Sequence, residues 1–197
     1  MQNEKLLALD IGGVCLKLYP EKYAKALGFD NWTKIPERVF NSTSLLEQGL
    51  ASARLWLNTI HEETAGQFTD TEIITAYNSI LGEEIECIRE WISELVKNGW
   101  KIVFLSNTSE IHVAHFSKYL NICEFVTGAI YSFDVASLKP DPKIYSAFVE
   151  RYWKPDLYID DNKENINTGE LLGWNSFHFT ESEFRIYKES LLNIRTK

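Results

Sequence analysis

Near its N-terminus the chain reads Leu6-Leu7-Ala8-Leu9-Asp10-Ile11-Gly12-Gly13-Val14. The apolar run is short enough for a buried strand, and the two glycines that follow Asp10 and Ile11 permit a sharp turn. Open α/β sheets bind their ligands outside the carboxyl ends of the strands. We therefore expect Asp10 to lie where such a sheet builds its site.

The rest of the chain alternates short apolar runs with stretches of helical period. Asp141-Pro142 is typical of a helix N-cap and first helical residue, and Gly173 is placed to end a helix over 162–172. Alternating strands and helices predict a Rossmann-like, doubly wound parallel sheet, an α/β fold with helices on both faces. The predicted strands cover residues 5–10, 101–106, 128–132, 157–160 and 176–179.

One long segment breaks this alternation. Residues 17–84 contain several helical patterns and no convincing strand. Because the segment follows the first predicted strand, we expect it to form a small helical cap over the site, inserted into an α/β core of residues 1–16 and 85–197. The aromatic residues of this segment are expected to pack within the cap, although one of them could line a substrate pocket: Trp32, Phe40 and Trp56.

Composition narrows the possible partners. The 197 residues include 20 basic and 28 acidic side chains, a net charge of −8. This balance disfavours binding to nucleic acid or an anionic membrane through bulk charge, so any phosphate-bearing ligand must be held by a local site. No apolar run approaches the ~20 residues of a membrane span. Three widely spaced cysteines argue against a disulfide framework or structural zinc and favour a reducing cytoplasm. The oligomeric state stays open.

Polar side chains follow three further predicted strands. Ser106-Asn107-Thr108-Ser109 comes first, then Lys139 before a proline-defined helix start, then Asp160 and Asp161. Each motif also has an ordinary structural explanation. The Ser/Thr segment could cap a helix, Lys139 could be a solvated loop lysine, and the acidic pair could lie in an exposed turn. Two adjacent carboxylates at a strand end favour a hard cation, and Mg²⁺ prefers such oxygen ligands.

Taken together in this order, the four motifs resemble the haloacid dehalogenase (HAD) superfamily of phosphohydrolases over nearly the whole chain. Leu138–Tyr145 and Asp160–Asn165 look most like the subgroup that holds sugar-phosphate phosphatases and the phosphatase domain of soluble epoxide hydrolase. Glu47-Gln48-Gly49-Leu50 resembles the helical cap of that subgroup. The resemblance implies a Mg²⁺-dependent phosphatase that hydrolyses a small phosphomonoester, with sugar phosphates as candidates, through an aspartyl-phosphate.

The resemblance also implies a role for each matching residue. Asp10 would be the nucleophile. Mg²⁺ would be held by Asp10, the Gly12 carbonyl and Asp161, with Asp160 supporting the site from close by.

The phosphate side of the site follows from the same resemblance. Ser106 and the Asn107 backbone N–H would bind phosphate, and Lys139 would neutralise both the nucleophile and the phosphate. Asn165 would orient the acidic loop.

Gly12 departs from the superfamily pattern. Most members that act on phosphate esters carry a second Asp two residues after the nucleophile, where it protonates the leaving group. General acid–base help is typically worth about 10²–10⁴-fold in rate. We therefore expect this chain to prefer substrates with better leaving groups, such as anomeric sugar phosphates or aryl phosphates.

Two other functions are alternatives to a phosphatase. A haloacid dehalogenase also lacks the second Asp and attacks carbon without a metal, but it usually lacks the acidic pair. A catalytically weak member of the fold would bind a phosphate ligand without turning it over. His112 and His115, three residues apart on one predicted helix, are expected on an exposed helix face rather than as metal ligands.

Overall fold

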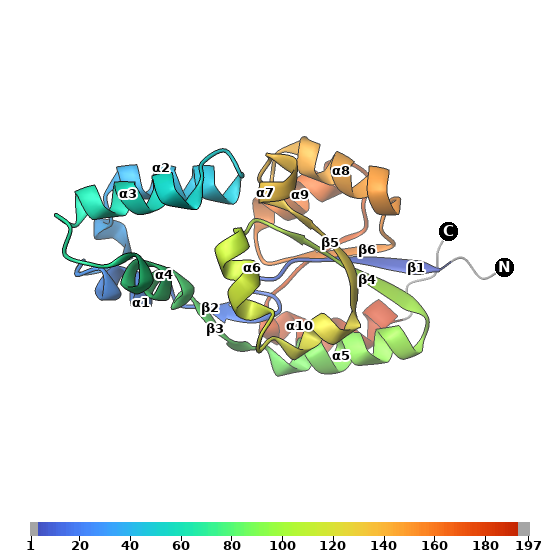
Figure 1. Ribbon diagram of the computed structural model, residues 1–197. Helices are drawn as coiled ribbons and strands as arrows, with labels where there is room; N and C mark the ends of the chain where they lie inside the picture. The colour runs from blue at the N-terminus through green and yellow to red at the C-terminus, as the bar shows by residue number, and fades with distance from the viewer. Residues whose placement is uncertain (1–3, 193–197) are drawn as a thin grey trace.

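The computed structural model describes residues 4–192 and contains a five-stranded sheet of order β5-β4-β1-β6-β7. All its neighbouring strands run parallel, so the predicted Rossmann-like α/β fold is confirmed (Figure 1). Each predicted strand lies within two residues of an observed one. The strands are β1 (Lys5–Leu9), β4 (Trp100–Ser106), β5 (Val126–Tyr131), β6 (Leu157–Asp160) and β7 (Ser176–His178).

The alternation of side chains along β1 divides the core into two layers. Leu7 and Leu9 pack with α5 (Glu86–Lys97) and α10 (Glu181–Leu192) on one face of the sheet. Leu6 and Ala8 point the other way, toward α8 (Pro142–Tyr152) and α9 (Lys163–Leu171). Successive strand side chains alternate between faces, so a fully apolar strand requires helices on both sides. Figure 1 shows these helices above and below the strands.

Capping residues set where the helices of the core begin. Asp141 accepts a hydrogen bond from the Lys143 N–H at 2.9 Å and caps α8 (Pro142–Tyr152) as predicted. Asn162 caps α9 (Lys163–Leu171) in the same way.

Within residues 4–192, no helix is long and apolar enough to cross a membrane. The remaining short helices are α6 (Glu110–Phe116), α7 (Ser132–Val135), η1 (Trp32–Lys34) and η2 (Asn121–Phe125).

A four-helix insertion, defined here as α1–α4, lies beyond the carboxyl ends of the parallel strands (Figure 1). It has an apolar cluster of its own, in which Tyr23, Trp56 and Tyr77 are almost completely buried. Large aromatic side chains bury about 150–250 Å² each, so these three add substantially to the apolar area of the cluster. The helices are α1 (Pro20–Ala26), α2 (Glu37–Glu47), α3 (Ala53–Glu63) and α4 (Asp70–Asn78).

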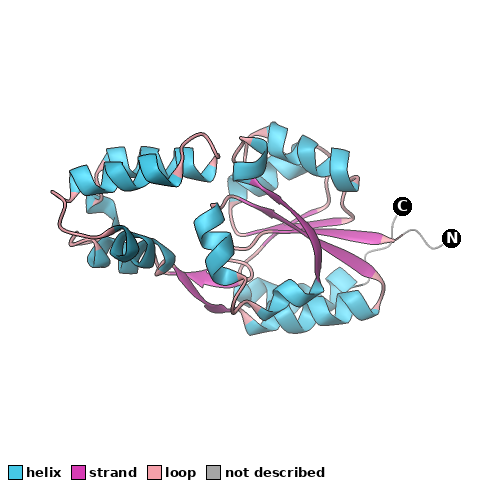
Figure 2. Cartoon of the chain, in the orientation of Figure 1, coloured by secondary structure: helices cyan, strands magenta, loops and turns pink. Residues whose placement is uncertain are grey.

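Two short strands connect the insertion to the core. β2 (Leu16–Leu18) pairs antiparallel with β3 (Leu81–Glu84), and Figure 2 shows this ribbon between the helical part and the main sheet. The expectation of no strand in residues 17–84 was therefore wrong. Each strand is too short and too exposed to show a clear alternation, and the pairing joins segments that lie far apart in the sequence.

His112 of α6 joins the core to the insertion. Its ring stacks on that of Tyr77 with centroids 3.8 Å apart, and its Nε2 lies 3.2 Å from the Tyr77 carbonyl oxygen. Because a carbonyl only accepts, Nε2 donates this bond. The expectation of an exposed face was wrong for His112, because α6 faces α4 rather than solvent. Burial lowers the pKa of His112 to about 4, so the ring is neutral near pH 7.

This burial makes stability depend on pH. The unfolded chain protonates His112 near the ordinary pKa of 6.5, whereas the folded chain does so only near 4, so stability falls as pH drops below about 6.5. At pH 5 the loss amounts to about 2 kcal/mol. His112→Phe keeps the ring stack and removes the titration. We expect urea unfolding at pH 7 and pH 5 to show a smaller acid-induced loss for this variant than for the wild type, and equal losses would contradict this account.

Candidate active site

The buried ammonium group of Lys139 brings two strand ends together. Its Nζ lies 2.9 Å from Oδ1 of Asp10, after β1, and 2.6 Å from Oδ2 of Asp160, at the end of β6. It also donates to the Leu105 carbonyl at 2.7 Å. Burial alone would lower the pKa of Lys139, but the charges of Asp10 and Asp160 hold it above its usual range. Lys139 is thus a fixed positive charge, not a solvated loop lysine.

Asp10 occupies the position that the sequence predicted. Its side chain lies beside Lys139, and its backbone N–H donates to the Ile159 carbonyl at 3.0 Å. Burial raises the pKa of Asp10 to about 7, with Lys139 acting in the opposite direction. The nearby Cys15 thiol donates to the Asp10 carbonyl at 3.1 Å, and burial raises the pKa of Cys15 well above its usual range. Cys15 is therefore a packed thiol and not a reactive thiolate.

Asp160 is completely buried and receives four hydrogen bonds. Besides Lys139, its donors are the Tyr158 hydroxyl at 2.6 Å, the Asn162 N–H at 2.9 Å and the Asn165 side-chain amide at 2.9 Å. Four donors compensate a carboxylate for its lost hydration. Asn165 thus lies where it holds the acidic loop in place.

Three carboxylates form a group that can hold a metal. One oxygen from each of Asp10, Asp160 and Asp161 lies within 4.8 Å of the others. Partial desolvation, and then the charge on Asp160, raises the pKa of Asp161. Oxygen atoms this close to one another repel when ionised, and an oxygen-preferring cation such as Mg²⁺ relieves that repulsion. The donor set therefore fits Mg²⁺.

The close approach of Asp161 explains why position 13 is glycine. Gly13 has φ +74°, in the region that favours glycine, and a Cβ atom there would overlap Oδ2 of Asp161. The turn after β1 and the acidic loop after β6 can therefore meet only if residue 13 has no side chain.

Position 12 is less constrained than position 13. Its backbone needs no positive φ, and a Cβ atom there would meet Cδ1 of Leu18 at 3.1 Å. The space in which a second carboxylate would begin is thus bounded by an apolar side chain from β2. An aspartate at this position would require Leu18 to move.

Asn107 has a function that the sequence did not reveal. Its side-chain oxygen accepts from the Lys139 N–H at 2.7 Å, and its amide donates to the Lys139 carbonyl at 2.9 Å. The side chain therefore fixes the backbone of Lys139 on both sides. The sequence pattern indicated only the backbone N–H of Asn107 as a ligand, because no local pattern predicts a contact between residues 32 positions apart.

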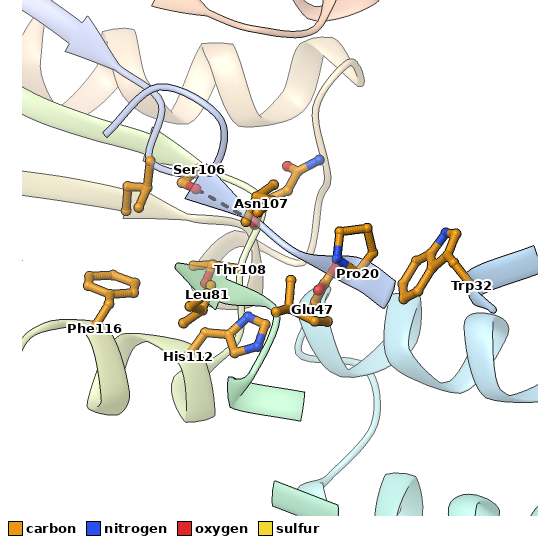
Figure 3. A pocket seen from close by; sticks show the side chains of 13 residues that line it. Pro20, Trp32, Glu47, Leu81, Ser106, Asn107, Thr108, His112 and Phe116 are labelled. Atoms are coloured by element: carbon orange, nitrogen blue, oxygen red, sulfur yellow. Dashed lines mark hydrogen bonds between the residues drawn. The ribbon is translucent and has the colours of Figure 1, made fainter. Parts of the chain in front are cut away.

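A cavity of about 310 Å³ extends from this site toward the insertion (Figure 3). Gly12, Ser106 and Asn107 line it at the end near Asp10 and Lys139, and Trp32, one of the three aromatic residues named in the sequence analysis, lines it on the insertion side. Trp56 is buried within the insertion instead. The other lining residues are Ile11, Leu18, Pro20, Glu47, Ile80, Leu81, Thr108, His112 and Phe116.

The chain belongs to the haloacid dehalogenase-like hydrolase family, whose model matches residues 4–173. The membership predicted from the four motifs is confirmed, and the protein is a hydrolase of this family. No protein of curated function matches the chain.

Solved structures share the fold. The HAD family enzyme BT-2542 from Bacteroides thetaiotaomicron has 22% identity and a TM-score of 0.82, with 93% of this chain and 98% of that chain covered. A HAD-like family hydrolase from Porphyromonas gingivalis has 21% identity and a TM-score of 0.80, with 98% of each chain covered. L-2-haloacid dehalogenase from Xanthobacter autotrophicus is less similar, with 14% identity and a TM-score of 0.60 over 98% of this chain and 89% of that chain.

Removal of the buried ammonium group of Lys139 should destabilise the folded protein. Lys139→Met leaves Asp10 and Asp160 without their shared partner, and we expect a loss of about 3 kcal/mol in the free energy of unfolding. Urea denaturation at pH 7.5 measures it. The matched control is Lys143→Met, because Lys143 is exposed on the following helix. A loss no larger than that of the control would show that Lys139 does not stabilise the site.

Proposed function

We propose that the protein is a Mg²⁺-dependent phosphatase that hydrolyses a small phosphomonoester through an aspartyl-phosphate on Asp10. The observation that carries this proposal is the Lys139 ammonium group between Asp10 and Asp160, next to a three-carboxylate group that fits Mg²⁺. A structure of BT-2542 contains magnesium and inorganic phosphate, which supports the same assignment here.

Charge balance is consistent with this function. Asp10, Asp161 and the Gly12 carbonyl would hold the metal, and Asp160 would support them. When bound, Mg²⁺ would neutralise charge on the phosphoryl oxygens and orient them. The three carboxylates are then balanced by one divalent cation and the Lys139 ammonium group. Positioning and charge neutralisation supply most of the catalysis in phosphoryl transfer.

The reaction would proceed in two displacements. A carboxylate oxygen of Asp10 attacks phosphorus, and the bond from phosphorus to the leaving oxygen breaks. The leaving oxygen takes a proton from water, because Gly12 offers no acid. Water then cleaves the aspartyl-phosphate, which releases inorganic phosphate and regenerates Asp10. Ser106 and the Asn107 N–H would bind the phosphoryl oxygens, while the charge of Lys139 favours the ionised form of Asp10.

The insertion would act as the substrate-selecting part of the enzyme. We assign residues 17–84 to a cap and residues 1–16 and 85–197 to the core, because the cavity receives lining residues from both. A cytoplasmic location suits the three free cysteines.

A dehalogenase is the second candidate, since the Xanthobacter autotrophicus enzyme shares the fold. The acidic pair Asp160–Asp161 favours phosphate chemistry, because attack on carbon without a metal has no use for it. A member of the fold that binds a phosphate ligand with little turnover is the third candidate, on account of Gly12.

The first test is hydrolysis of p-nitrophenyl phosphate and a panel of sugar phosphates. We expect phosphate release that requires Mg²⁺, stops with EDTA, and falls by about 10³-fold or more in Asp10→Asn, because the nucleophile is lost. Halide release from 2-chloropropionate that persists in EDTA would instead support the dehalogenase. Binding of phosphate esters without turnover would support the third candidate.

The second test concerns the missing acid at Gly12. Glucose 1-phosphate has the better leaving group, so we expect its kcat/KM to exceed that of glucose 6-phosphate by about tenfold or more. Gly12→Asp introduces a carboxylate, and Leu18→Ala makes room for it. This double variant should reduce the ratio of the two kcat/KM values. Leu18→Ala alone is the control for a change in cavity shape. Equal kcat/KM values for the two sugars in the wild type would refute the leaving-group preference.

A further inference from the structure

Among the described residues that line the cavity, Glu47 is the only one with a charged side chain. It is the last residue of α2, in the insertion, and most of the other residues that line the cavity are apolar, among them Leu18, Leu81 and Phe116. Figure 3 shows Glu47 among the lining side chains. The phosphatase reaction proposed above gives this carboxylate no role.

The carboxylate has few partners within the described part of the chain. The Tyr77 hydroxyl donates to its Oε1 at 2.9 Å, and no lysine, arginine or histidine among residues 4–192 forms an ion pair with it. His112, which lines the same cavity, directs its Nε2 to the Tyr77 carbonyl instead. A carboxylate can accept about four hydrogen bonds, so Glu47 has acceptor capacity left for a ligand. Burial also raises the pKa of Glu47, while the hydrogen bond from Tyr77 acts in the opposite direction.

The position of Glu47 relative to the phosphate end is fixed. The Ser132 hydroxyl donates to the Glu47 backbone carbonyl at 2.5 Å and accepts from the Thr108 N–H at 3.0 Å, two residues after Ser106. One hydroxyl thus connects the end of α2 to the loop that follows β4.

A second contact holds the same helix end. Gly49 lies so close to the Phe133 carbonyl that a Cβ atom there would overlap it. Since Ser132 and Phe133 both belong to α7 of the core, the end of α2 is attached to the core at two neighbouring points.

We propose that Glu47 selects the leaving group of the substrate by accepting a hydrogen bond from a donor, an ammonium or hydroxyl group, on an otherwise apolar organic part. The phosphoryl group lies at Asp10 and Ser106, the apolar part fills the cavity, and the donor reaches Glu47. This inference rests on the proposed phosphatase function, which it makes more specific. An analogue without the donor leaves the carboxylate unpaired, and such sites discriminate strongly against it.

Three matched aryl phosphates test the proposal: 4-(2-aminoethyl)phenyl, 4-(2-hydroxyethyl)phenyl and 4-propylphenyl phosphate. They differ at one terminal group and have similar phenol leaving groups. We expect kcat/KM for the better of the two donor-bearing compounds to exceed that for the propyl compound by about tenfold or more. Whether ammonium or hydroxyl is favoured identifies the donor.

Glu47→Gln should reduce this preference by about tenfold if the donor is ammonium, because the negative charge is lost, and by less if it is hydroxyl. The matched control is Glu37→Gln, an exposed position at the start of the same helix, which should retain the wild-type ratio. Thermal unfolding checks that each variant is folded. Equal kcat/KM values for all three compounds in the wild type, or a preference that is unchanged in Glu47→Gln, would overturn the proposal.

Non-hydrolysable phosphonates separate this proposal from the phosphatase function. Dissociation constants for the 4-(2-aminoethyl)phenyl, 4-(2-hydroxyethyl)phenyl and 4-propylphenyl phosphonates are measured by calorimetry with Mg²⁺. Failure to hydrolyse any aryl phosphate, with a donor preference still present in binding, would refute the phosphatase and retain the Glu47 site. Hydrolysis that depends on Asp10, without any donor preference in hydrolysis or binding, would support the phosphatase and refute the Glu47 site.

Discussion

The ammonium group of Lys139 between two carboxylates is the interaction on which the site depends. Asp10 and Asp160 come from the ends of adjacent strands β1 and β6, and both are buried. Without a shared cation, their mutual repulsion and lost hydration would oppose the close packing of these strand ends. Asn107 extends the arrangement to β4, because its side chain holds the backbone of Lys139 by two hydrogen bonds. The same lysine therefore balances the buried charges of the site and connects the ends of neighbouring strands of the sheet.

Two neighbouring glycines show how differently the same residue type can serve a site. Gly13 is required by the geometry, since only a residue without a side chain allows the Asp161 carboxylate to approach at that φ. Gly12 is not required by its backbone, and its neighbour Leu18 occupies the adjoining space. Position 13 is thus constrained by the close approach of Asp161, whereas position 12 is constrained only by the side chain of Leu18.

The contact between the insertion and the core determines the shape of the cavity. His112 stacks on Tyr77, Tyr77 donates to Glu47, and Ser132 connects the Glu47 carbonyl to the loop after β4. These contacts hold Glu47 of the insertion beside the loop that follows β4, at the cavity that both parts of the chain line.

The sequence alone determined the strands of the sheet and four of the site positions. Buried parallel strands appear as short apolar runs, and the carboxyl ends of such strands meet at one edge, so Asp10, Lys139, Asp160 and Asp161 could be placed together. The tertiary structure decided what no local pattern encodes. The β2–β3 ribbon, the burial of His112, the hold of Asn107 on Lys139 and the position of Glu47 all join segments far apart in the chain. They depend on which way a side chain points across an interface, and periodicity within one segment carries no information about that direction.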